Sequence, residues 1–226
     1  MFEYAFENLD NFKLYRMKIN IRSFPFKLRY ISLIVLILIS VQFALGQQQV
    51  YRFHSGLIEV SGFTNSYNWK MKTDSVDCRS QLSIINGQLK SINSLSLTVP
   101  VNKLSSPNTY MDRIAHRTLK SYPFDKIYFH YVKSELLPWD DKDQYLVKAS
   151  GNLTIAGITQ AIKMDLIATV INDGIITFAG THKLKLSTFQ VTPKKTLMGT
   201  LKTSDEVTVN FVVGVKPFIL PAVPKK

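Results

Sequence analysis

Side chains that could do chemistry are few in this chain and stand far apart. The sequence contains four histidines, and none of them forms the H-x-H or H-E-x-x-H pattern that would aim two ring nitrogens at one metal ion. His54 and His182 are isolated, His116 is expected to face solvent on a helix, and His130 falls on the outer face of a strand. We therefore predict no metal site.

The residues required for nucleophilic catalysis are not visible either. The sequence has no G-x-S-x-G elbow, and its single cysteine, Cys78, has no histidine nearby in the chain. Cys78 shares strand parity with Val76 and Leu82, so we expect a buried, unreactive thiol that packs as a small hydrophobic group. The acidic cluster at residues 140–143 lies between two strand-like runs and is interpreted as a solvated loop. We predict no catalytic residue and no enzymatic activity.

Apolar and polar side chains alternate with a period of two along most of the chain after residue 50, which places them on opposite faces of β-strands. Turn signals such as Asn86-Gly87, Ala156-Gly157 and residues 172–174 separate consecutive runs. The pattern predicts an all-β antiparallel barrel or sandwich of about eight strands with hairpin connections. The alternating runs are residues 76–84, 95–101, 126–136, 144–155, 162–170, 176–186 and 207–213.

One segment, residues 108–121, departs from this alternation. Met111, Ile114, Ala115 and Leu119 have helical spacing, Asn108 is a suitable N-cap, and a proline follows the segment. We predict one short amphipathic helix that lies across an open end of the barrel.

The inward-facing set does not decide whether the barrel is hollow. A barrel of about eight strands is either filled by side chains or wide enough for one small ligand. Large residues such as Phe129 and Phe178 alternate with small ones such as Ala168 and Gly180, which suits both a lumen and a filled core.

The first 46 residues are predicted to direct export. Residues 31–46 form an apolar run that follows several basic residues and ends with small residues at Ala44 and Gly46. The run is shorter than the roughly 20 residues that span a bilayer, which favours a cleaved signal peptide over an uncleaved anchor. We expect cleavage after Gly46 and a periplasmic or secreted protein. The sequence leaves open whether translation starts at Met1 or Met17.

The remaining 180 residues are enough for one domain with a real core. We expect a barrel domain at residues 47–216 and a tail rich in proline and lysine at residues 217–226, outside the sheet. The whole chain has a net charge of +12, and residues 1–46 contain six basic and three acidic residues, so the remainder has +9. This charge suits peripheral contact with an anionic membrane surface. Nucleic-acid binding is not expected, because the aromatic residues fall on apolar faces.

Several stretches resemble the YceI-like family of exported, lipocalin-like barrels. The C-terminal block is the most specific: residues 173–178 and 183–186, then Pro193, residues 197–203 with a turn at Gly199, and residues 205–211. The others are residues 151–159, residues 111–113 with 119–121, and Val60-Ser61-Gly62 with Trp69-Lys70-Met71. Together they cover roughly residues 50–215. One branch of the family carries a His-Asp pair before the tryptophan, and this chain has Tyr67-Asn68 instead.

The resemblance implies a lumen that binds a polyisoprenoid or another long-chain apolar ligand, so the protein would act in carriage or sequestration. It implies no dedicated cofactor, with an isoprenoid lipid or a quinone as the bound molecule. Tyr67 and His182 are candidates for contact with a polar headgroup. The full set of candidate ligand-binding residues is Tyr67, Trp69, Phe129, Met164, Phe178, His182 and Phe211.

Two other functions stay open on the sequence. A structural or stress-related envelope protein would have a filled barrel and bind a protein partner on its surface. An enzyme would need convergent ionisable groups in the lumen, and no nucleophile–base arrangement is visible. Neither the oligomeric state nor the ligand's identity follows from the sequence.

Overall fold

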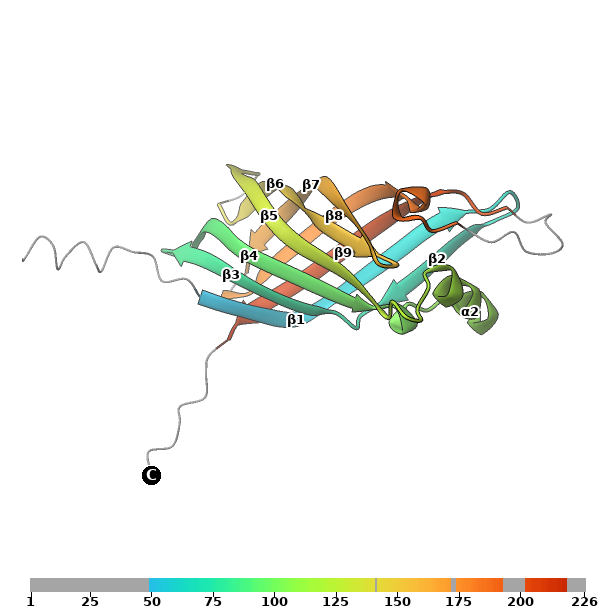
Figure 1. The fold of residues 1–226 in the computed structure, drawn as a ribbon. Helices are drawn as coiled ribbons and strands as arrows, with labels where there is room; N and C mark the ends of the chain where they lie inside the picture. The colour runs from blue at the N-terminus through green and yellow to red at the C-terminus, as the bar shows by residue number, and fades with distance from the viewer. Residues whose placement is uncertain (1–48, 141, 172–173, 193–201, 219–226) are drawn as a thin grey trace, which may run out of the picture. The chain divides into compact units, whose positions relative to one another are not determined.

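The computed structural model describes residues 49–140, 142–171, 174–192 and 202–218 (Figure 1). The predicted signal peptide with its cleavage site, the turn residues Asn172 and Asp173, Gly199 and the tail after Phe218 lie outside the described residues.

Strands dominate the described chain and form one antiparallel sheet that closes into a barrel (Figure 1). The sheet order is β2-β1-β3-β4-β5-β6-β7-β8-β9, and β9 pairs with β1 to close it. The strands are β1 (Gln49–Phe63), β2 (Asn68–Thr73), β3 (Asp77–Ile85), β4 (Gln88–Pro100), β5 (Lys126–Pro138), β6 (Gln144–Ile155), β7 (Ile158–Val170), β8 (Ile176–Lys185) and β9 (Glu206–Pro217).

Although nine strands are described, the barrel has eight strand positions. β2 and β3 lie in line along the same edge of β1, where Thr73 pairs with Ile58 and Arg79 pairs with Arg52. Residues 74–76 interrupt this edge between the two strands. The predicted all-β barrel of about eight strands is therefore confirmed.

Tight turns connect neighbouring strands where the sequence signals them. Asn86 and Gly87 join β3 to β4 with φ angles of 52° and 75°, and Ala156 and Gly157 join β6 to β7 with 50° and 82°. Two successive positive φ angles match the right-handed twist of the flanking strands, as in a type I′ hairpin.

The predicted helix is α2 (Thr109–Thr118), which follows the short 3₁₀ segment η2 (Val101–Lys103). The side chain of Asn108 accepts hydrogen bonds from the backbone N–H groups of Tyr110, at 2.9 Å, and Met111, at 3.3 Å, so its N-cap role is confirmed. A second 3₁₀ segment, η4 (Leu186–Phe189), follows β8. Among the described residues, no helix has the length and apolar character needed to cross a membrane.

The prediction that Pro217 lies outside the sheet is wrong. Pro217 ends β9 and pairs with Tyr51 of β1. A proline at a strand end removes only one ladder donor, so the strand tolerates it there.

One end of the barrel is filled. It is the end that holds the start of β1, the β3–β4 hairpin and the end of β9 (Figure 1). Its inward side chains pack into a core with almost no exposure to solvent. The members of this core that do not reach the cavity described below are Tyr51, Val76, Leu82, Leu89, Ala168, Ile176 and Val215.

Candidate ligand-binding site

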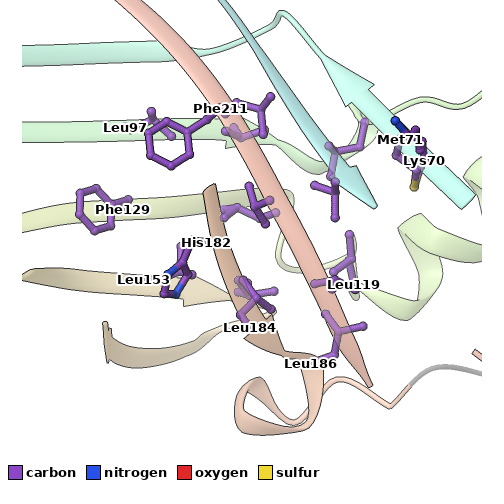
Figure 2. A pocket seen from close by; sticks show the side chains of 18 of the residues that line it. Lys70, Met71, Leu97, Leu119, Phe129, Leu153, His182, Leu184, Leu186 and Phe211 are labelled. Carbon is purple, nitrogen blue, oxygen red and sulfur yellow. The ribbon is translucent and has the colours of Figure 1, made fainter. Parts of the chain in front are cut away.

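The other half of the barrel is hollow. It encloses a cavity of about 680 Å³, within the range of roughly 300–1,000 Å³ that is usual for small-molecule sites. The wall consists of inward side chains of the strands, and α2 covers part of the open end (Figures 1 and 2). The filled barrel required by the structural alternative is therefore not observed at this end.

All seven candidate residues lie on the wall of this one cavity. Tyr67 and Trp69 come from the β1–β2 hairpin at the open end, and Phe178 lies at the boundary with the filled core, with 4% of its surface exposed. His182 comes from β8, the strand that also holds Phe178. The other three residues are Phe129 of β5, Met164 of β7 and Phe211 of β9. The structure thus brings the whole set together around one space.

Three aromatic rings of the wall lie directly over glycines of the neighbouring strand. A Cβ atom added to Gly62 would come within 2.4 Å of the Trp69 ring. One added to Gly151 would come within 2.4 Å of the Phe129 ring, and one at Gly180 within 2.8 Å of the Phe211 ring. Because each ring occupies the space that a side chain would fill, it lies along the wall. This arrangement leaves the lumen open although its lining is aromatic.

The apolar face of α2 completes the cavity. Met111, Ile114, Ala115 and Leu119 line it, at the helical spacing visible in the sequence. No residue of α2 itself is buried, so its apolar face looks onto the cavity, whereas Leu119, the C-cap, also packs against a small core cluster that contains Ile155 and Phe189. An amphipathic helix gains most of its stability from burying its apolar face. A ligand in the cavity would supply that missing burial.

Two contacts attach the α2 region to β2 and the hairpin before it. The hydroxyl of Tyr67 donates a long hydrogen bond of 3.8 Å to Sδ of Met111. Backbone hydrogen bonds join Lys72 and Ser105 in both directions, at 2.8 and 3.0 Å. These contacts hold the start of the helix at the rim of the open end.

His116 does not face solvent as expected. Its Nε2 atom lies 2.8 Å from the carbonyl oxygen of Leu104, and the ring is half-buried. The helical spacing places it between the inner and outer faces of α2, which explains why a two-face pattern misassigned it.

Polar groups of the cavity wall lie toward its open half. Burial lowers the pKa of His182, which favours the neutral imidazole. The Nε1 atom of Trp69 is buried and has no hydrogen-bond partner among the described residues. Nζ of Lys70 forms a salt bridge of 2.9 Å with Glu59. Hydrogen bonds from Lys70 and Lys72 lower the pKa of the Glu59 carboxyl.

The deep part of the cavity is apolar. Cys78 lies there with no exposed surface, and burial, with a smaller effect from the charge of Asp77, raises the pKa of its thiol to about 12. The thiol is therefore protonated near neutral pH, and the prediction that Cys78 is buried is confirmed. Within the described part of the chain, no three His, Cys, Asp or Glu side chains are grouped as a metal site would require.

The sequence reasoning missed several wall residues although their signal was present. Leu97, Leu153 and Leu184 lie on the lumen faces of β4, β6 and β8 in the same alternation as the candidates (Figure 2). The predicted set consists mainly of aromatic residues and does not include these leucines. The chemistry of the complete site is that of an apolar enclosure with a few hydrogen-bonding groups near its entrance.

The barrel is similar to solved structures whose sequences are too distant to indicate more than the fold. A polyisoprenoid binding domain from Saccharophagus degradans implicated in plant cell wall breakdown is 11% identical, with a TM-score of 0.60 over 76% of this chain and 100% of that chain. BcnA from Burkholderia cenocepacia is 16% identical, with a TM-score of 0.53 over 70% of this chain and 95% of that chain.

No curated protein matches the sequence. A family model, that of the YceI-like domain, matches residues 48–215, which include β1 to β8 and all but the last two residues of β9. The chain belongs to the YceI-like family.

Proposed function

We propose that this chain is an exported lipid-binding protein that encloses a polyisoprenoid or another long-chain apolar ligand and serves to carry or sequester it. The observation that carries the proposal is the apolar cavity of about 680 Å³, which the unburied apolar face of α2 helps to line. The similarity of the fold to a polyisoprenoid binding domain supports the choice of ligand class. The family and the charge pattern of residues 1–46 support export.

The energetics favour a ligand with a long tail. Each methylene group moved out of water contributes about 0.8 kcal/mol, so about ten of them contribute on the order of 8 kcal/mol. The costs of immobilising the ligand reduce this gain, and micromolar or tighter binding remains within reach.

The distribution of polar groups gives the ligand an orientation. The deep wall around Cys78 and Phe178 is apolar, and the buried hydroxyl of Ser80, which has no hydrogen-bond partner among the described residues, is not one of the lining residues. Nearer the open end, Tyr67 offers a hydroxyl and His182 a neutral imidazole, while the indole N–H of Trp69 is buried against the wall. The tail would therefore enter first and the polar end would lie close to Tyr67, Trp69 and His182. Among the described residues, these polar groups do not form a nucleophile–base arrangement, so we propose binding without chemistry.

The direct test is lipid extraction followed by mass spectrometry of protein purified from its native envelope. We expect one long-chain lipid class in an amount close to that of the protein. The intact mass of the same preparation tests export, and it should correspond to a chain that begins at Gln47. Extracts free of any long-chain lipid would overturn the binding proposal, and a mass that retains residues 31–46 would overturn cleavage.

A further inference from the structure

The outer face of α2 is basic and aromatic, whereas the face that lines the cavity is apolar. Arg113 and Arg117 are exposed, and so is Tyr110, with 59% of its surface accessible. The guanidinium of Arg113 lies over the Tyr110 ring at 5.8 Å from its centroid. The single acidic residue of the helix, Asp112, is held by the backbone N–H and the hydroxyl of Ser106, at 2.8 and 2.7 Å.

The turn after α2 extends this surface along the same end of the barrel. Lys120 is exposed, and Tyr122 has 94% of its surface accessible. Phe124 is also exposed, and its ring lies over Gly157 in the β6–β7 hairpin, which fixes the turn at the barrel rim. We call the surface formed by Tyr110, Arg113, Arg117, Lys120, Tyr122 and Phe124 the basic–aromatic face.

The charge around the basic–aromatic face is positive. Residues 101–126 contain five basic and two acidic residues, a net charge of +3. The filled end also exposes an aromatic side chain, Trp139, and the described charged residues that follow it are Asp140, Lys142 and Asp143, which give no net positive charge. At the filled end, Arg52 also lies over an aromatic ring, that of Phe218, at 3.8 Å from its centroid, but this ring is half-buried. The end that opens to the cavity differs because its basic residues stand beside the exposed rings of Tyr110 and Tyr122.

This combination matches the surface of an anionic bilayer. Basic residues are attracted by the negative surface potential of such a membrane, and tyrosine rings are favoured at the level of the headgroups. Leu119, directly beside the basic–aromatic face, lines the cavity. A face pressed on a bilayer would bring the cavity entrance to the membrane surface, and a lipid could then pass between the two with little exposure to water.

We propose that the basic–aromatic face docks the barrel, by its α2 end, on a membrane surface that contains anionic lipids, and that the cavity is loaded or emptied there. The proposal rests on the proposed function only for the transfer of lipid. The docking itself is independent of what the cavity holds.

Flotation with vesicles tests the docking. Purified protein is mixed with vesicles of phosphatidylcholine alone or with added phosphatidylglycerol. We expect binding only to the anionic vesicles, and weaker binding as the salt concentration rises. The double variant Arg113→Glu/Arg117→Glu should weaken this binding by about tenfold or more. Urea midpoints of variant and wild type establish that both are folded to the same extent.

Matched variants at other positions separate the face from overall charge. Lys90→Glu/Lys133→Glu makes the same charge change on exposed positions of β4 and β5, and should leave binding within about twofold of wild type. Tyr110→Ser/Tyr122→Ser should weaken binding, while Trp139→Ser at the filled end should not. Equal losses in the two charge variants would overturn the docking face.

The outcomes also separate docking from the proposed function. If the protein carries a lipid but does not bind anionic vesicles, the docking proposal fails, the cavity function stands, and a protein partner becomes the occupant of this face. If anionic vesicles bind the wild type but not Arg113→Glu/Arg117→Glu, docking is supported even when lipid extracts are empty.

Discussion

Gly62 and Trp69 face each other across the β1–β2 ladder, and the indole ring lies where a Cβ atom of residue 62 would be. We expect Gly62→Ala to push the ring away from the wall, because the methyl group would come within 2.4 Å of it. Such overpacking costs about 1–3 kcal/mol. The urea midpoint gives the loss, and fluorescence in a Trp139→Phe background reports Trp69 alone.

A second substitution provides the control for this contact. In the double variant Gly62→Ala/Trp69→Leu, the smaller side chain leaves room for the methyl group. The double variant should therefore lose less stability than the sum of the two single variants. Simple additivity would contradict a steric contact between the two residues.

The contrast between filled and hollow ends predicts unequal costs for the same truncation on neighbouring strands. Leu82 of β3 has no exposed surface and belongs to the filled core, so Leu82→Ala should cost about 2–5 kcal/mol. Leu97 of β4 borders the cavity and has fewer contacts to lose, so Leu97→Ala should cost less than about 2 kcal/mol. Urea unfolding of the ligand-free proteins measures both. Equal costs would indicate that the barrel is filled at both ends.

Cys78 should resist thiol reagents in the folded protein. Its thiol has no exposed surface and a pKa raised to about 12, so very little thiolate exists at about pH 8. We expect slow labelling under native conditions and rapid labelling in urea, where the same thiol is exposed. Fast labelling of the folded protein would contradict the burial and reopen the question of an active thiolate.

His182 makes stability depend on pH. Burial lowers its pKa in the folded state, so the unfolded chain binds the proton more readily and acid favours unfolding. The contribution is complete above the ordinary histidine pKa of about 6.5 and is lost as the pH falls through the lowered folded value. Wild type should therefore lose more stability than His182→Gln between about pH 7 and about pH 5. If the urea midpoints of the two proteins fall by the same amount across this pH range, His182 does not contribute to the pH dependence.

Much of the fold was readable because each strand has one buried face. The alternation in β7, β8 and β9, the turns at Asn86 and Ala156, and the N-cap at Asn108 all act locally, and local signals survive in sequence. The first strand was harder to read. A bulge lies between Phe53 and Ser55. Because of it, odd-numbered residues such as Tyr51 are buried before the bulge and even-numbered ones such as Ile58 after it, so the period of two breaks within β1.

The state of the lumen could not be predicted in the same way. It depends on whether rings such as Phe129 and Phe211 project inward or lie along the wall, and that depends on Gly151 and Gly180 in neighbouring strands. These pairs are far apart in sequence and become neighbours only through the register. The residue types alone therefore suit a filled and a hollow barrel equally.

The central claim, that the cavity is open and binds a long-chain lipid, is tested most directly by one matched pair on β7. Ile162 lines the cavity, and its neighbour Ala161 is exposed on the outer face. A tryptophan at residue 162 should fit into the empty space, whereas one at residue 161 adds the same side chain outside.

The measurement is the urea midpoint with and without added polyprenyl lipid. A ligand that binds only the folded state raises the midpoint by mass action. We expect the lipid to raise it for wild type and Ala161→Trp, and to raise it much less for Ile162→Trp, which remains folded without lipid. No shift in wild type with any long-chain lipid, together with strong destabilisation of Ile162→Trp, would contradict the account.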